Sequence, residues 1–200
     1  IARLFATADR LLLGVQCDEP EMARLQSAPA KHDAQVWAGD CIELFIQPDG
    51  KGAYYHFITN ADGARYDERE RDGAWNAEWE ARGHREETGW SVELAIPWTA
   101  LGNPPQPGAR WRLNVCRSRR PQPEICAWSA TGSGFHVPDR FGEVCFGASA
   151  WLSDLDWGQP WTGAQQVSVR ATGGALSVGV GRSPAVRVAP GAATPVAYTA

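Results

Sequence analysis

The sequence has one methionine, few clustered basic residues and no long apolar run, and each shortage excludes a class of protein. No apolar stretch among the 200 residues approaches the length that spans a membrane. A net charge of −4 argues against binding to a phosphate backbone, which needs clustered Lys and Arg. The one basic cluster, Arg117, Arg119 and Arg120, is typical of a solvated turn. We expect no nucleic-acid partner and no membrane segment in this fragment.

Zinc-binding spacing is also absent from the cysteines. They lie at positions 17, 41, 116, 126 and 145, each inside a strand-like run, without a CxxC pair or a Cys/His pattern. Buried thiols are the default interpretation. Cys116 and Cys126 flank a turn and can face each other across a hairpin, but the odd number of cysteines leaves the redox compartment open.

Helical periodicity is almost absent, and short strands with turn signals about every ten residues dominate the chain. In the run Cys41 to Ile46, the residues Ile42, Leu44 and Ile46 share one face, while Glu43 and its alternate neighbours share the other. The first face is expected in the core. Such a pattern predicts an antiparallel β-sandwich or barrel.

The composition changes after Gly147. Residues 148–200 lose most of their charge and gain Gly, Ala, Val and Pro, and the runs 166–170 and 175–180 predict a hairpin around Gly173 and Gly174. We predict a first domain over 1–147 and a linker or truncated second β-rich domain over 148–200. Because the chain begins with Ile1, we expect a segment of a longer protein.

Tryptophan is the compositional outlier, with ten residues. Several of them stand beside Gly, Asp, Asn or Ser in expected loops or strand ends, and an exposed Trp without a partner is costly. Trp37 offers a flat apolar surface, and Glu43, six residues later, offers a carboxylate that can orient a ligand. The alternative interpretation makes Glu43 a solvated outward residue and Trp37 a rim residue that covers the sandwich.

These segments resemble the family 9 carbohydrate-binding modules and their DOMON-like relatives. The resemblance covers residues 1–147 and lies in Val36 to Ile46, Gly89 to Trp98, Trp111 to Arg117, and the closing pieces Trp128-Ser129 and Phe141-Gly142-Glu143. It implies an all-β antiparallel sandwich of the DOMON-like, immunoglobulin-like jelly-roll type. It also implies that two tryptophans hold the end of a sugar chain, polar side chains read the hydroxyls, and calcium helps to fix loops.

The same resemblance implies the site residues. Trp37 and Glu43 match the first tryptophan and the following glutamate of the motif, Trp128 is the candidate second tryptophan, and Arg65 and Asn114 stand where polar contacts are expected. The chain is then a non-catalytic module for a poly- or oligosaccharide. It is expected outside the cell or in the periplasm, joined to other domains of its chain such as a glycoside hydrolase.

Three other roles remain open. Asp18 and Glu19 are weak candidates for calcium, against a solvated acidic turn. Glu43 and Glu93 both project away from the expected core, and two carboxylates about 5 to 9 Å apart can cleave a glycosidic bond. A haem-binding DOMON-like domain needs axial Met or His ligands, but the chain has only Met22, four histidines and no CxxCH site, so no haem is expected.

Overall fold

The chain forms two compact units, Ile1–Phe146 and Gly147–Ala200. The computed structural model describes residues 1–132, 134–147, 151–156, 164–172, 176–178, 186–191 and 193–199. No helix among these residues is long and apolar enough to cross a membrane. The first unit holds every residue that the sequence predicts for the site.

Short antiparallel strands build the first unit. They are β1 (Ala2–Ala6), β2 (Arg10–Asp18), β3 (Cys41–Gln47), β4 (Tyr55–Thr59), β5 (Arg65–Arg69), β6 (Glu80–Arg85), β7 (Gly89–Pro97), β8 (Arg110–Arg119), β9 (Glu124–Ala127) and β10 (Gly142–Cys145). Single-turn 3₁₀ helices connect some of them: η1 (Met22–Arg24), η2 (Val36–Ala38), η3 (Pro48–Gly50), η4 (Trp98–Ala100) and η5 (Pro138–Arg140).

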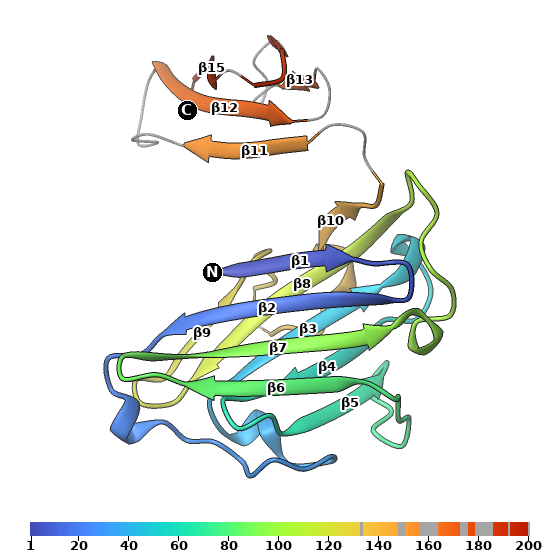
Figure 1. Ribbon diagram of the computed structural model, residues 1–200, viewed down its shortest axis with the longest axis vertical. Coiled ribbons are helices and arrows are strands. Elements are labelled where there is room, and N and C mark those ends of the chain that lie inside the picture. The colour runs from blue at the N-terminus through green and yellow to red at the C-terminus, as the bar shows by residue number, and fades with distance from the viewer. Residues whose placement is uncertain are drawn as a thin grey trace. The chain divides into compact units, whose positions relative to one another are not determined.

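Two sheets stack face to face. The order of one sheet is β1-β2-β7-β6, and the order of the other is β10-β8-β3-β4-β5, with β9 pairing to β8. Figure 1 shows the first sheet in front of the second. Neighbouring strands run antiparallel, as in the β2–β7 and β3–β8 pairs. The predicted all-β antiparallel sandwich is confirmed.

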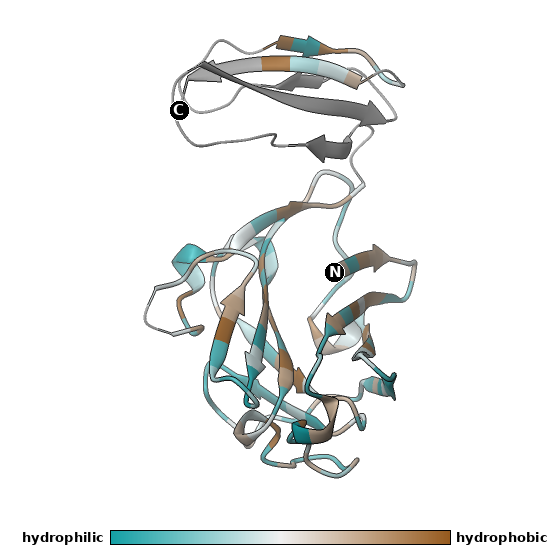
Figure 2. Cartoon of the chain, turned by 90° about the vertical axis from the view of Figure 1, so that its left-hand side faces the viewer, coloured by the Kyte–Doolittle hydropathy of each residue, from teal (hydrophilic) through white to brown (hydrophobic). Residues whose placement is uncertain are grey.

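Alternating side chains explain why these sheets stack. Ile42, Leu44 and Ile46 of β3 pack between the sheets with Leu13 of β2 and Leu94 of β7. Figure 2 shows apolar and hydrophilic residues alternating along strands of this unit. Burying each such aliphatic side chain contributes about 1.5–3 kcal/mol. The core face predicted for β3 is therefore correct.

The other face of β3 is buried as well, which the sequence did not predict. Every residue of β3 is buried. At one end Cys41 packs with Val36 of η2, and at the other end Phe45 packs with Phe141, which follows η5. Two segments distant in sequence thus cover the outer face of the larger sheet.

One close approach joins the edges of the sheets. A Cβ atom added at Gly83 of β6 would collide with the carbonyl oxygen of Ala61, which follows β4. Nearby, the fully buried Asp67 of β5 accepts hydrogen bonds from the indole N–H of Trp79 (2.8 Å) and the backbone N–H of Ala77 (2.7 Å). These contacts fix the chain that leads from β5 to β6.

The second unit contains β11 (Trp151–Asp156), β12 (Ala164–Thr172), β13 (Leu176–Val178), β14 (Val186–Val188) and β15 (Ala193–Thr199). The predicted hairpin of 166–170 with 175–180 is wrong, because β12 pairs with β11 and β15 while β13 pairs with β14. Gly173 and Gly174 lie outside the described residues. The assignment of 148–200 as a linker or truncated domain stays a prediction.

Candidate functional site

A cluster of polar side chains lies on the outer face of β3, β4 and β5. We call Glu43, His56, Tyr66, Glu68 and His136 the polar cluster. Residues opposite each other in an antiparallel pair share a face, and His56 is opposite Glu68 in the β4–β5 pair. His136 comes from the loop before η5 and closes the cluster.

His56 is the centre of the polar cluster. Its Nε2 atom is 2.9 Å from Glu43 Oε2, and its Nδ1 atom is 3.0 Å from Glu68 Oε1. The ring stacks on Phe45 with 3.9 Å between centroids, and the residue is 2% exposed. An imidazole donates from both nitrogens only when it is protonated, so this geometry favours the imidazolium.

The electrostatics of the cluster agree with that geometry. Burial lowers the pKa of His56, but the hydrogen bonds to the Glu43 and Glu68 carboxylates outweigh it and leave the pKa above its ordinary value. The hydrogen bond from His56 lowers the pKa of Glu68, and burial lowers the pKa of His136. The cluster therefore favours charge on His56 and Glu68 and disfavours it on His136.

Trp37 stands at the margin of the polar cluster. The indole, in η2, is 42% exposed and meets the Tyr66 ring edge-on with 4.6 Å between centroids. The Tyr66 hydroxyl donates to Glu68 Oε2 at 3.1 Å. Trp37 thus connects to Glu43 through Tyr66, Glu68 and His56.

The structure corrects the expectation that the Glu43 carboxylate is exposed beside Trp37 to orient a ligand. Glu43 is only 7% exposed, because His56 and Ser118 bond to its carboxylate. The two residues lie on the same side of the larger sheet, but Trp37 faces solvent and Glu43 does not.

Sequence reasoning missed most members of the polar cluster. His56 and Glu68 could have been found, because each occupies an outward position on a strand next to β3 or β4. His136 gives no such signal, since it comes from a loop. Its Nδ1 atom is 2.9 Å from the Tyr54 hydroxyl oxygen and 3.7 Å from Glu68 Oε1.

Trp128 lies on the opposite side of the larger sheet. Its backbone N–H bonds to the Val115 carbonyl in the β8–β9 ladder, so the two residues share the face that Val115 turns toward the core. A Cβ atom added at Gly142 would collide with the Trp128 ring, which places the ring over Gly142. The indole is 58% exposed, but it cannot enclose one sugar together with Trp37. The expected pair of tryptophans is not formed.

Arg65 and Asn114 also stand apart from Trp37. Arg65 is half-buried on the inner face of β5, where its guanidinium bonds to the Trp79 carbonyl and lies 5.8 Å from the centre of the Trp79 ring. Asn114 is fully buried, and its amide donates to and accepts from the backbone of Ser129 at 2.9 Å each. Both side chains thus form hydrogen bonds with the backbone of neighbouring segments.

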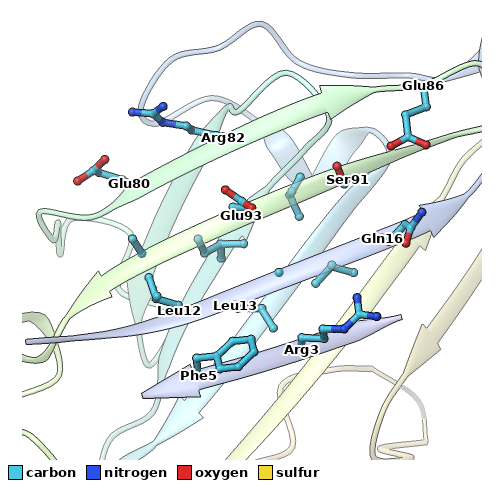
Figure 3. Close-up of a pocket in the computed structure, with 15 residues that line it drawn as sticks. Arg3, Phe5, Leu12, Leu13, Gln16, Glu80, Arg82, Glu86, Ser91 and Glu93 are labelled. Carbon is cyan, nitrogen blue, oxygen red and sulfur yellow. The ribbon is translucent and has the colours of Figure 1, made fainter. Parts of the chain in front are cut away.

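The carboxylate pair of the hydrolase alternative is split between two surfaces. Glu93 of β7 lines a groove of about 640 Å³ on the outer face of the smaller sheet, where Figure 3 shows it among Glu80, Arg82 and Phe5. Glu43 lies on the outer face of the larger sheet. Stacked sheets are about 10 Å apart, so the separation exceeds the roughly 5 to 9.5 Å that glycosidases use. These two glutamates are not a catalytic pair.

Glu19, a calcium candidate, is bound to arginine instead. Its fully buried carboxylate accepts from Arg119 at 2.6 and 2.7 Å and from Arg117 at 3.1 Å. Asp18 is exposed. Calcium needs several free oxygen ligands, so this pair of residues does not fit it. Arg117 and Arg119 are likewise not part of a solvated turn.

No disulfide joins Cys116 and Cys126, because the register places Cys126 opposite Arg117 and so on the other face. All five cysteines are free thiols. Cys17, Cys41 and Cys116 are buried as expected, whereas Cys126 and Cys145 are exposed.

Solved structures share this fold. A candidate carbohydrate-binding protein from Bacteroides uniformis has 20% identity and a TM-score of 0.58, with 72% of this chain and 76% of that chain covered. A family 9 carbohydrate-binding module from Caldicellulosiruptor kristjanssonii in complex with cellotriose has 16% identity and a TM-score of 0.55, covering 72% of each chain.

A family 9 carbohydrate-binding module from Caldicellulosiruptor kristjanssonii in complex with glucose has 16% identity and a TM-score of 0.56, with 72% of this chain and 74% of that chain covered. At such identities the similarity shows the fold alone, and at that level it confirms the resemblance drawn from the sequence. No protein-family model and no curated protein sequence matches the chain.

Proposed function

We propose that residues 1–147 bind a poly- or oligosaccharide without converting it, and that Trp37 is the stacking platform. The observation that carries this proposal is the exposed Trp37 indole, which stands edge-on against Tyr66 at the margin of the polar cluster. The fold shared with carbohydrate-binding modules supports the ligand class.

The chemistry of a pyranose suits this arrangement. One face of the sugar presents C–H groups that an indole can cover, and the rim presents hydroxyls that need hydrogen-bond partners. Tyr66 and His136 are half-buried beside Glu68 and supply hydroxyl, imidazole and carboxylate groups. Glu43 contributes indirectly, because its hydrogen bond holds the His56 ring in place.

A glycan array on the whole chain identifies the sugar, and calorimetry with Trp37→Ala then tests the platform. Loss of one stacked ring costs about 1–3 kcal/mol, which is about a 5- to 150-fold rise in Kd. Phe5→Ala and Trp128→Ala are matched controls, because these rings are 62% and 58% exposed on other surfaces. Unchanged affinity in Trp37→Ala, with loss in either control, would move the site to that other surface.

The setting of the module follows from the same proposal. We infer that it works outside the cell or in the periplasm, beside other domains of a longer chain that act on the same glycan. An absorbance scan distinguishes sugar binding from the haem-binding alternative. A Soret band in the purified protein would favour haem. Its absence, together with a sugar-induced change in Trp fluorescence, would favour sugar binding.

A further inference from the structure

Three members of the polar cluster converge as metal ligands do. His56, Glu68 and His136 each offer one ligand atom, and these atoms lie within 4.8 Å of one another. Glu68 Oε1 is 3.0 Å from His56 Nδ1 and 3.7 Å from His136 Nδ1. A tetrahedral zinc ion with bonds of about 2.0–2.1 Å holds its ligands roughly 3.3 Å apart. Of the two distances from Glu68 Oε1, one is shorter and the other longer than that value.

We propose that His56, Glu68 and His136 bind a divalent first-row transition ion such as zinc, through the two Nδ1 atoms and one carboxylate oxygen. The ion ties the loop that carries His136 to strands β4 and β5. This site shares Glu68 and His136 with the polar side of the proposed sugar site, but Trp37, the stacking platform, supplies none of its ligands.

The chemistry of the donors selects the kind of ion. Two imidazoles and a carboxylate are ligands that suit zinc and its neighbours, whereas calcium and magnesium prefer oxygen alone. With neutral imidazoles, Glu43 and Glu68 bring two negative charges to the cluster, which a divalent cation neutralises. Because the two carboxylates are 7% and 8% exposed, little water screens that attraction.

The partners of the three ligands are those that a metal site requires. A histidine ligand usually donates its other ring N–H to a carboxylate, which fixes the tautomer and the ring orientation. His56 Nε2 meets Glu43 Oε2 at 2.9 Å, which leaves Nδ1 for the ion. Tyr66 in turn holds Glu68 through Oε2, so that Oε1 is the carboxylate oxygen that faces His56 and His136.

Binding exchanges hydrogen bonds for metal bonds. The ion takes the place of the proton shared between His56 Nδ1 and Glu68 Oε1. It also displaces the Tyr54 hydroxyl from His136 Nδ1. His136 keeps 24% of its side chain exposed, so the ion can enter from that side.

Calorimetric titration of the EDTA-treated full chain with zinc chloride, without sugar, tests the proposal. We expect one tight site per chain and a rise in thermal midpoint with zinc, because a ligand that binds only the folded state stabilises it. His136→Ala should weaken binding by more than about 100-fold and abolish the thermal shift, and Glu43→Gln should weaken it by about 10- to 100-fold.

The controls separate this site from adventitious binding. His84→Ala removes an exposed histidine elsewhere and should change nothing. Cys126→Ser with Cys145→Ser removes the exposed thiols and should also leave zinc affinity unchanged. Circular dichroism of His136→Ala checks that this variant is folded.

Zinc affinity that is unchanged in folded His136→Ala, or lost in the thiol variant, would overturn the proposal, as would the absence of binding to the wild type. Trp37→Ala should keep full zinc affinity while losing sugar, so either proposal can fail without the other.

Discussion

Replacing Glu19 by Gln should strongly destabilise the first unit. The Glu19 side chain is fully buried, and it accepts two hydrogen bonds from Arg119 and one from Arg117, residues about a hundred positions further along the chain. Removing one partner of a buried ion pair costs about 3–5 kcal/mol, because the other charge stays buried and unpaired.

The lower end of that range applies here. The side chains of Arg117 and Arg119 are 18% and 11% exposed, so both guanidinium groups can recover some hydration when the carboxylate is gone. We therefore expect a loss of about 3 kcal/mol. For a unit of this size, that corresponds to a fall in thermal midpoint of roughly 6–12 °C.

Urea unfolding of both proteins, followed by Trp fluorescence across a pH series, measures this loss. Hydrogen bonding to Arg119 is the main cause that lowers the pKa of Glu19 below its ordinary value of 4.5. The group therefore stabilises the fold above pH 4.5, and this stabilisation is lost as the pH falls through the lowered pKa of the folded state. The difference between wild type and Glu19→Gln should shrink accordingly in acid.

Glu124→Gln is the matched control. Glu124 is 62% exposed and lies 3.8 Å from the same Arg119, so its loss should cost less than about 1 kcal/mol. Equal stability of Glu19→Gln and wild type at pH 7, or a difference that does not change with pH, would refute this reasoning. A difference that disappears on adding EDTA would instead restore Glu19 as a calcium ligand.

Three further predictions concern stability and thiol reactivity. Asn114→Ala should lower the free energy of unfolding by about 1–3 kcal/mol by leaving the backbone of Ser129 unpaired, with sugar affinity unchanged; the reverse result in calorimetry and urea titration would make Asn114 a binding residue. Gly83→Ala should cost about 1–3 kcal/mol or more because its Cβ meets Ala61, while Gly14→Ala, where the Cβ meets nothing within 4 Å, should not destabilise; equal thermal midpoints would contradict this. A thiol reagent should label only the exposed Cys126 and Cys145 of the native protein, because burial shields the other three thiols and raises the pKa of Cys17 to about 11. Labelling of more than two cysteines without unfolding would contradict the burial of Cys17, Cys41 and Cys116.

The sequence predicted the strands well because their signal is local. Alternation in Cys41 to Ile46 gave the correct core face, and the frequent turn signals gave the antiparallel all-β class. Such patterns depend only on a period of two residues and on turn chemistry.

The site was harder to predict because it depends on contacts between distant segments. Nothing near Glu43 reveals that η2 and the loop at His136 cover its face, so the carboxylate appeared solvated. The register of β9 on β8 decides which face of the larger sheet carries Trp128, and a shift of one residue would move it to the other face. The pairing of Glu19 with Arg119 has no local signal at all.

The order of strands in the two sheets has a consequence for biosynthesis. β2 pairs with β7, and β3 pairs with β8, so neither early strand can form this pair until the later strand has been synthesised. The ribosome therefore has to release most of the first unit before the sandwich can close, and early strands with unpaired edges are exposed meanwhile to aggregation and to chaperones. Closure through such remote pairings is typical of folding in milliseconds to seconds rather than microseconds.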